Sequence, residues 1–257
     1  MISVANILPN NCINKDMVRQ KYEMYLTHKV LEDSTRFEFL AEDEKNNVNS
    51  FKILDNSACE LGEGLCLDDV LKAASIIKAH EIVLPDIPRS GKSLCKTLRY
   101  LADVPVDIPY QIAAVVQGDT EDEVLSCAEQ LIVLKRVNTL MIPKWYCGMN
   151  SSNGLGRHHI TSSIIRMMYE YKMPKQIHWL GLDTGMRELI TPLAQVVRSV
   201  DTGYLAAIST PQWSNLDLFA DRPRELKIDL ENMPVDIDRW FALVCQQQRI
   251  LEGEINV

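Results

Sequence analysis

The chain has 257 residues, of which 46% are hydrophobic and 24% are charged. This composition is typical of a folded protein with a large buried core and excludes a largely disordered chain. The 27 Lys and Arg residues are outnumbered by 35 Asp and Glu residues, which gives a formal net charge of −8. A surface coated with positive charge for nucleic acid is therefore excluded, although one local basic face is not.

The sequence predicts a protein with no membrane segment and no secretory signal. It has no run of about eighteen apolar residues, and the first residues, MISVANILPNNCINKD, lack a basic stretch before their short apolar run. Seven cysteines are scattered without a CxxC pair or a metal-binding spacing. Such an odd, unpatterned set is typical of reduced thiols, so we expect a cytoplasmic protein. No cofactor and no metal site is expected.

Seven short apolar runs alternate with helical patterns along the chain. Their near-continuous apolar character is typical of strands buried on both faces of a parallel sheet. The runs are residues 3–8, 50–55, 81–86, 111–118, 138–143, 177–182 and 197–201. Their alternation with helices predicts an α/β fold, a TIM-like (β/α)8 barrel in which residues 1–257 form a single domain. The eighth strand is not evident, and residues 35–43 and 225–230 are the candidates.

The segments between the runs carry helix signals. The predicted helices are residues 67–79, 120–137, 185–197 and, at the C-terminus, 235–254 with an apolar stripe at Trp240, Phe241, Val244 and Ile250. The second of these opens with the capping-box pair Thr120 and Glu123, and Pro192 predicts that the third is split or kinked. Residues 145–159 are rich in Gly, Asn and Ser and are predicted to form a long loop, which in a compact domain is often functional.

In a barrel of this kind, catalytic groups gather at the carboxyl ends of the strands. The runs place there Asp55, Asp86, Gln117 with Gly118, Lys144, Gly181 with Asp183, and Asp201. A single Asp after a strand is often a helix N-cap or a turn residue. Three carboxylates and an amide at one rim favour an active site instead. His178 lies inside an apolar strand and is predicted to be a core histidine with satisfied hydrogen bonds.

Taken in order, these segments resemble the tRNA-guanine transglycosylase superfamily, barrel enzymes that exchange guanine for a 7-deazaguanine. VVQGDTEDEV (115–124) resembles the family's valine-glutamine-glycine strand end, and ILDNSACELG (53–62) resembles its aspartate-serine-glycine-glycine loop, with Ala58 and Cys59 in place of the glycines. EIVLPDIP (81–88) is similar to the strand whose aspartate reads the base, IHWLGLDTGMRELI (177–190) to the strand and helix before the nucleophile, and VRSVDT (197–202) to the strand that carries the nucleophile. The resemblance covers residues 50–205.

Two departures indicate a branch of that superfamily. Its C-terminal zinc site of three cysteines and a histidine is absent, since only Cys245 lies in that region, and the chain is shorter than those enzymes. In both respects the chain resembles the DNA-modifying, phage-type branch, and this resemblance implies the host cytoplasm as its location if a phage encodes it. The resemblance therefore implies a pentosyltransferase with DNA and a free 7-deazaguanine base as substrates, and it admits a homodimer. The alternatives are the same exchange on tRNA, a metal-dependent barrel lyase or aldolase, and an inactive barrel that serves as a binding subunit.

The resemblance also implies a role for each residue. Asp201 is expected to be the nucleophile at the sugar, and Asp55 to take a proton from the incoming base. The residues expected to bind the base are Asp86, Gln117, Gly118, Gly181, Asn56 and Ser57.

A target base must be flipped out of a duplex or presented in a single strand, which calls for an electropositive rim. The expected nucleic-acid contacts are Arg89, Lys92, Arg157, His158 and Arg198, with Lys96, Arg99, His159 and Arg166 nearby; solvated helix faces are the alternative interpretation. Trp145, Tyr146 and Tyr204 either stack on a base or are buried in the core.

Overall fold

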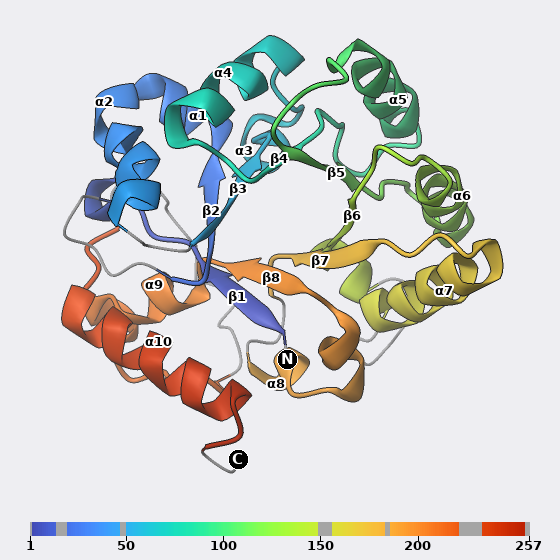
Figure 1. The fold of residues 1–257 in the computed structure, drawn as a ribbon. Helices are drawn as coiled ribbons and strands as arrows, with labels where there is room; N and C mark the ends of the chain where they lie inside the picture. The colour runs from blue at the N-terminus through green and yellow to red at the C-terminus, as the bar shows by residue number, and fades with distance from the viewer. Residues whose placement is uncertain are drawn as a thin grey trace.

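Eight parallel strands form the centre of the molecule, and helices surround them (Figure 1). The structure, a computed structural model, describes residues 2–13, 20–46, 50–148, 156–182, 186–220 and 233–254. The strands are β1 Ser3–Asn6, β2 Tyr22–Leu26, β3 Phe51–Asp55, β4 Glu81–Val83, β5 Gln111–Val115, β6 Thr139–Pro143, β7 Gln176–Leu180 and β8 Ser199–Thr202. Their order is β1-β8-β7-β6-β5-β4-β3-β2, so the predicted TIM-like barrel is confirmed.

Helices follow most strands and cover the outside of the sheet (Figure 1). The α-helices are α1 Thr27–Glu32, α2 Ser34–Phe37, α3 Ala58–Leu61, α4 Leu67–Ile77, α5 Ser93–Asp103, α6 Glu121–Ile132, α7 Gly156–Tyr171, α8 Met186–Leu189, α9 Tyr204–Ile208 and α10 Ile237–Leu251. The 3₁₀ helices are η1 Asn10–Cys12, η2 Glu38–Asn46, η3 Lys144–Gly148, η4 Pro192–Val196 and η5 Pro211–Trp213.

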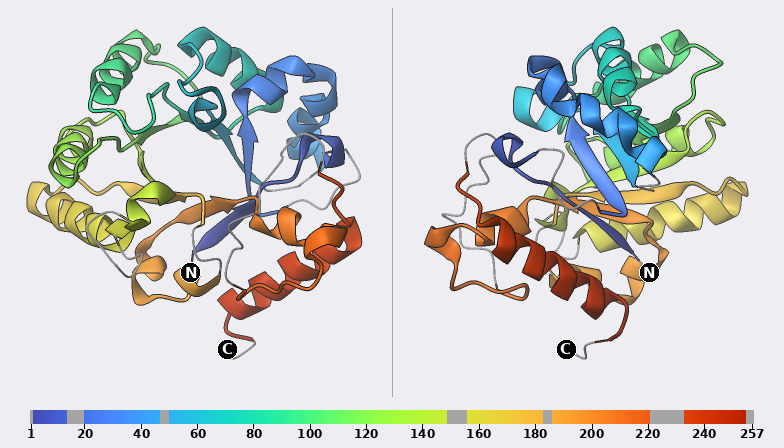
Figure 2. Two further views of the ribbon diagram at one scale, coloured as in Figure 1. Left: turned by 180° about the vertical axis from the view of Figure 1, so that it is seen from behind. Right: turned by 60° about the vertical axis from the view of Figure 1, so that its left-hand side comes forward.

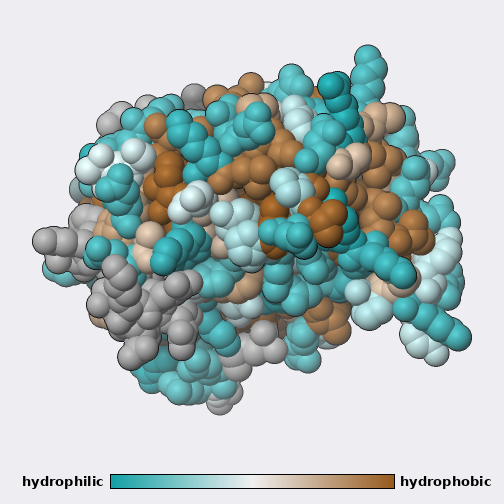
Figure 3. Space-filling model, turned by 45° about the horizontal axis from the view of Figure 1, so that its top comes forward, coloured by the Kyte–Doolittle hydropathy of each residue, from teal (hydrophilic) through white to brown (hydrophobic). Residues whose placement is uncertain are grey.

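On the face shown in Figure 3, hydrophilic side chains divide the hydrophobic areas from one another.

Local sequence signals account for the helix boundaries. Thr120 and Glu123 form the predicted capping box at the start of α6. Pro192 stands at the start of η4 and separates it from α8, so the predicted split is confirmed. The Asp236 side chain accepts a hydrogen bond from the backbone N of Arg239 and caps α10.

Side chains alternate between the inside of the barrel and the layer between sheet and helices. One buried apolar cluster fills the inside and contains Ala5, Met24, Ile53, Val83, Ala113, Val115 and Met141. Their sequence neighbours, such as Leu54, Ile82 and Leu140, belong to the larger cluster that includes the helices. This alternation has a period of two residues, so a side chain two positions beyond an inward one also points inward.

The barrel has one seam that strand pairing does not seal. In the described residues β1 pairs with β8 and β2 pairs with β3, but β1 and β2 are not hydrogen-bonded as strands. The side chain of Gln20 bridges part of this gap, since its Nε2 donates to the Asn6 carbonyl at 3.0 Å and its Oε1 accepts from the Asn6 backbone N at 3.2 Å. Asn6 Nδ2 also donates to Gln247 of α10 at 2.9 Å, and α10 lies on this side of the barrel (Figure 2).

The floor of the barrel is closed by a buried ion pair. Glu81 is fully buried, and its two carboxylate oxygens each accept from Arg198 at 2.7 Å. Thr139 donates to the same carboxylate at 2.6 Å, and the guanidinium lies over the ring of Phe51 at 5.2 Å. Because Arg198 precedes β8, it lies at the amino ends of the strands. The expectation that it contacts nucleic acid beside the active site is therefore corrected.

The eighth strand is β2, which the apolar runs did not indicate. Its sequence YEMYL is interrupted by Glu23, a residue that is nevertheless buried. The expectation of a strand at residues 35–43 is wrong, because Asp33 caps a helix there and the chain continues as η2. Residues 225–230 lie outside the described residues.

Two other expectations need adjustment. Phe241 is 42% exposed, so it does not belong to the buried face of α10 that contains Trp240 and Val244. The segment 145–159, expected to be a loop, is helical where it is described, because η3 occupies its start and α7 its end; residues 149–155 lie outside the described residues.

Replacing Glu81 with Gln should destabilise the protein strongly, because the Arg198 charge would be left in the barrel floor without its partner. We expect the free energy of unfolding, measured with urea, to fall by about 3–5 kcal/mol. The control is Glu254→Gln in the exposed pair with Arg249 on α10, which should cost less than about 1 kcal/mol. Equal losses of unfolding free energy in the two variants would contradict a stabilising role of the Glu81–Arg198 pair.

Candidate active site

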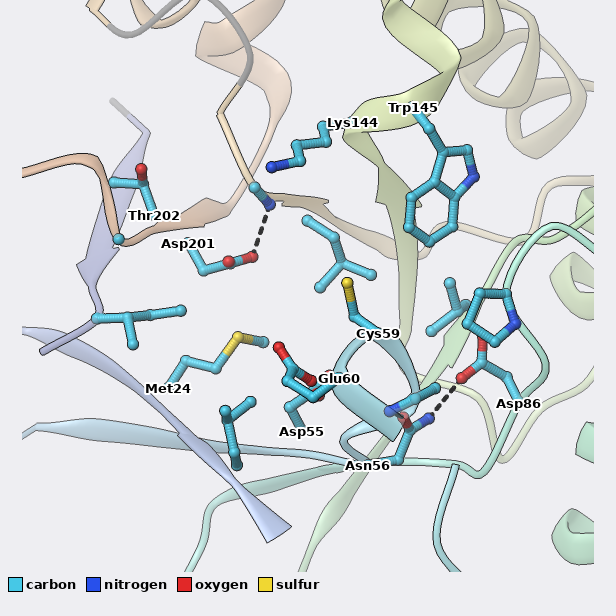
Figure 4. Close-up of a pocket in the computed structure, with 18 of the residues that line it drawn as sticks. Met24, Asp55, Asn56, Cys59, Glu60, Asp86, Lys144, Trp145, Asp201 and Thr202 are labelled. Carbon is cyan, nitrogen blue, oxygen red and sulfur yellow. Dashed lines mark hydrogen bonds between the residues drawn. The ribbon is translucent and has the colours of Figure 1, made fainter. Parts of the chain in front are cut away.

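A cavity of about 210 Å³ opens at the carboxyl ends of the strands (Figure 4). Its charged lining residues are Asp55, Glu60, Asp86, Lys144 and Asp201, and apolar side chains such as Met24 and Leu180 complete its walls. In Figure 4, Asp201 and Lys144 lie on one side of the cavity and Asp86 lies on the other. The three predicted carboxylates are therefore brought together in one cavity.

Asp201 lies in β8 and is held through one oxygen. Its Oδ1 accepts from the backbone N of Gly181 at 3.0 Å and contacts Nε2 of His178 at 3.1 Å. No hydrogen bond to Oδ2 is present within the described part of the chain. The side chain is 11% exposed. The carboxylate is thus oriented by two partners on one oxygen, while its other oxygen is left for a ligand.

Gly181 is required at its position for two reasons. Its φ of +68° lies in the left-handed region, where side chains are strained, and a Cβ there would come within 2.9 Å of Lys144 Cδ. The glycine therefore turns the end of β7 so that its N–H reaches Asp201, and it leaves room for the Lys144 side chain beside the cavity. Asp183, also expected at this strand end, lies outside the described residues.

Asp55 ends β3 and begins a tight turn. Its Oδ2 accepts from the backbone N of Ser57 at 2.8 Å, and Asn56 Oδ1 accepts from the backbone N of Ala58 at 2.8 Å. Ser57 adopts a φ of 64°, an uncommon conformation for a residue other than glycine. Its hydroxyl accepts from the backbone N of His28, and the residue is fully buried outside the cavity lining. Ser57 therefore shapes the turn, and its expected contact with the base is corrected.

The pKa of Asp55 is raised well above its ordinary value. Burial is the main cause, since it disfavours the charged form, and the charges of Glu60, Asp86 and Asp201 add to it. The hydrogen bond from Ser57 acts in the opposite direction. A carboxyl group with a raised pKa is suited to give and take protons near neutral pH.

Asp86 is bracketed by two amides. Asn56 Nδ2 donates to Oδ1 at 2.8 Å, and Gln117 Nε2 donates to Oδ2. Gln117 Oε1 accepts from the backbone N of Arg89, which fixes the orientation of its amide. Burial raises the pKa of Asp86, and the two amide donors oppose this effect. Each carboxylate oxygen keeps acceptor capacity toward the cavity.

Gly118 does not line the cavity. A Cβ at this position would lie 2.7 Å from the backbone N of Val124, so the glycine lets α6 approach the end of β5. Gly118 therefore serves the packing of α6 against β5, and the expectation that it contacts a base is corrected.

Two charged groups of the cavity were not among the expected site residues. Glu60 of α3 lies between Asp55 and Asp201 in Figure 4, and burial followed by the charge of Asp201 raises the pKa of its carboxyl group. Lys144 lowers that pKa, so its ammonium group is the counter-charge of the cavity. Glu60 had no sequence signal beyond its position in the turn after β3. Lys144 was recognised as a strand-end residue without a role.

His178 is a core histidine with satisfied hydrogen bonds, as expected, but one of its partners is Asp201. The residue is fully buried, and its Nδ1 contacts Ser199 Oγ at 2.8 Å. The alternation of side chains along a strand could have predicted that His178 lies below the cavity. In the sequence, His178 lies two residues before Leu180, a residue of the cavity wall, and Ser199 lies two residues before Asp201.

The expected basic contacts fall into two groups. Arg89 and Lys92 are exposed after β4, and Arg89 lies over the ring of Trp145 at 5.4 Å. Arg157 is fully buried, pairs with Glu188, and donates to the carbonyl of Gly181 at 2.7 Å. Arg157 thus supports the backbone that holds Asp201, and its expected contact with nucleic acid is corrected.

The remaining basic residues differ in their surroundings. His158 is partly buried, stacks on Trp179 at 5.1 Å, and has a pKa lowered mainly by burial. Lys96 pairs with Glu63 at 2.6 Å and His159 contacts Glu121 at 2.8 Å. Arg99 and Arg166 are exposed on the outer helices α5 and α7.

The three aromatic candidates separate in the same way. Trp145 lines the cavity. Tyr146 and Tyr204 are buried, and their hydroxyl groups donate to the carbonyls of Val116 and Ala220 at 3.1 Å each.

No family model matches this chain, and no curated protein matches it. The described residues include no group of three or more His, Cys, Asp or Glu side chains arranged to hold a metal ion. No helix in the described parts of the chain has the length and apolar character needed to span a membrane.

Replacing Asp55 with Asn should stabilise the protein at neutral pH. Because folding raises the pKa of Asp55, the folded wild-type protein loses stability as pH rises from the unfolded-state value, about 3.9, to the folded-state pKa. The stability advantage of Asp55→Asn should therefore be small at acid pH, grow through this window and then remain constant. Urea unfolding at several pH values measures it. The exposed control Asp107→Asn should show no such trend. A variant that is less stable than wild type at pH 8 would contradict this prediction.

Proposed function

We propose that this chain is a pentosyltransferase that replaces guanine in DNA with a 7-deazaguanine derivative through a covalent aspartyl-sugar intermediate. One observation carries the proposal: a single cavity at the carboxyl ends of the barrel strands has an oriented carboxylate, Asp201, on one side and an amide-bracketed carboxylate, Asp86, on the other. The order of these segments along the chain, which resembles the transglycosylase superfamily, supports the same function.

Asp86 matches the edge of guanine that is remote from the sugar. That edge carries the N1–H and the 2-amino group, both donors, and an ionised carboxylate is an acceptor only. Asn56 and Gln117 hold the carboxylate plane in place, and the second N–H of the Gln117 amide is a donor for the 6-oxo group. A base without this pattern would leave buried groups unpaired, which is the basis for strong discrimination. Trp145 provides an aromatic surface beside the same cavity.

Asp201 acts on the sugar. Its free oxygen attacks C1′ and forms the aspartyl ester while the C1′–N9 bond breaks and its electron pair leaves with guanine. The departing base takes the proton of Asp55 at that nitrogen. The incoming 7-deazaguanine then gives its ring proton to the Asp55 carboxylate and attacks C1′, and the Asp201 carboxylate is released. Atoms and charge balance, and the enzyme returns to its starting state.

The raised pKa of Asp55 suits this double role, because the same group must be an acid in the first half and a base in the second. Among the described residues, Lys144 and the exposed Arg89 and Lys92 provide positive charge for the phosphates of a flipped nucleotide. DNA is proposed over tRNA because the chain resembles the DNA-modifying branch of the superfamily.

Asp201→Asn should abolish base exchange, by roughly 10³-fold or more, because an amide is a poor nucleophile and a poor leaving group. The Asn oxygen can still accept from Gly181, so the variant should fold as wild type does. Incorporation of labelled base into DNA and trapping of the covalent protein–DNA adduct on denaturing gels measure the effect. Full activity in this variant would remove Asp201 from the mechanism.

Asp86→Asn should weaken guanine and 7-deazaguanine binding by roughly 10- to 100-fold, since an acceptor for two N–H groups becomes in part a donor. Calorimetric titration of the free base against wild type, this variant and the exposed control Asp107→Asn measures it. Unchanged affinity in Asp86→Asn would show that the base is read elsewhere.

Labelled 7-deazaguanine should enter DNA and not tRNA when each is incubated with the protein, as measured by mass spectrometry of the released nucleosides. Incorporation into tRNA alone would assign the protein to the tRNA branch.

A further inference from the structure

We infer that His178 is a positioning residue for Asp201, held in the required orientation by Ser199 and Arg198 through the middle of the barrel. The expected effect on kcat rests on the proposed function, whereas the contacts and the tautomer of His178 do not depend on it.

The contacts form one continuous chain from the barrel floor to the cavity. Arg198 Nε donates to Ser199 Oγ at 3.0 Å, Ser199 Oγ lies 2.8 Å from His178 Nδ1, and His178 Nε2 lies 3.1 Å from Asp201 Oδ1. His178 and Ser199 are both fully buried, and no ring nitrogen of His178 is left without a partner. Strand register produces this arrangement, because His178 of β7 is paired with Ser199 of β8.

The partners determine which ring nitrogen of His178 carries a hydrogen. An ionised carboxylate only accepts hydrogen bonds, so Nε2 must be a donor toward Asp201. The guanidinium only donates, so the Ser199 oxygen is an acceptor toward Arg198 and its hydroxyl hydrogen is free for Nδ1. Each hydrogen-bonding group of Ser199 and His178 along this row of contacts then has a partner, which a buried network requires. In its neutral form the ring therefore carries its hydrogen on Nε2.

This tautomer leaves Asp201 with two donors on Oδ1, the Nε2–H of His178 and the N–H of Gly181. Oδ2 is thereby directed away from them as the attacking oxygen. When Oδ2 forms the ester, Oδ1 becomes its carbonyl oxygen and keeps both donors. Loss of His178 should therefore affect the chemical step, kcat, more than the affinity for the base.

Three substitutions at this position separate positioning from packing. His178→Gln keeps a donor close to the position of Nε2, His178→Asn keeps a polar group only near Nδ1, and His178→Leu removes both. We expect kcat to fall roughly 10- to 100-fold in the Asn and Leu variants, with KM for the base changed by less than about threefold, and most of kcat to be restored in the Gln variant. The control His80→Gln, at the floor of the barrel, should leave kcat unchanged.

Equal kcat losses in the Gln and Leu variants, or a change confined to KM, would overturn the positioning role. Ser199→Ala is a second test, because it keeps the ring and removes only the group that orients it; an unchanged kcat in this variant would overturn the contribution of Ser199.

A measurement without substrate tests the structural part. Long-range nitrogen-15 NMR of the five histidine rings identifies the tautomer of each, and the signal missing in His178→Gln assigns His178. We expect a hydrogen on Nε2 and a changed Nε2 shift in Asp201→Asn. A neutral ring with its hydrogen on Nδ1 would overturn the inference. If wild-type protein shows this tautomer but exchanges no base into either DNA or tRNA, the proposed function fails while the contact stands.

Discussion

The carboxylates of Asp55, Asp86 and Asp201 share one poorly solvated cavity. Many residues at the carboxyl ends of the strands hold these carboxylates in place. Burial raises the pKa of Asp55 and of Asp86, and the neighbouring negative charges add to this effect at Asp55. Each carboxylate has hydrogen-bond donors of its own, and these donors follow the ends of β3, β5 and β7. The left-handed conformations at Ser57 and Gly181 follow from this requirement, because in both cases the backbone N–H must turn toward a carboxylate.

Support for the site extends through the barrel to its floor. Arg198 closes the floor with Glu81 and also donates to Ser199, which contacts His178 below Asp201. A single guanidinium thus takes part in both stability and the orientation of the proposed nucleophile. Arg157 supports the same strand end from outside, through the carbonyl of Gly181. Two arginines that composition alone would assign to a surface are instead internal parts of the scaffold.

The acidic character of the chain has a consequence for the proposed nucleic-acid substrate. The net charge is −8, and the internal arginines Arg157 and Arg198 are already paired, so the described part of the chain offers few cations at the cavity rim. Lys144 lines the cavity, and Arg89 lies over the ring of Trp145, another lining residue. Under the proposed function, recognition would depend more on the flipped base in its cavity than on extended contacts with the phosphate backbone.

The barrel, seven of its strands and three acidic residues at their ends could be predicted from the sequence. Strand runs, capping residues and helix signals are local, and the carboxyl ends of parallel strands meet on one rim. The strand β2 escaped, since a buried Glu23 interrupts its apolar pattern. The contact of His178 with Asp201, and the pairing of Arg198 with Glu81, 117 positions away, became visible in the folded barrel alone. Partners so distant in sequence are set by strand register and barrel closure, which no local pattern encodes.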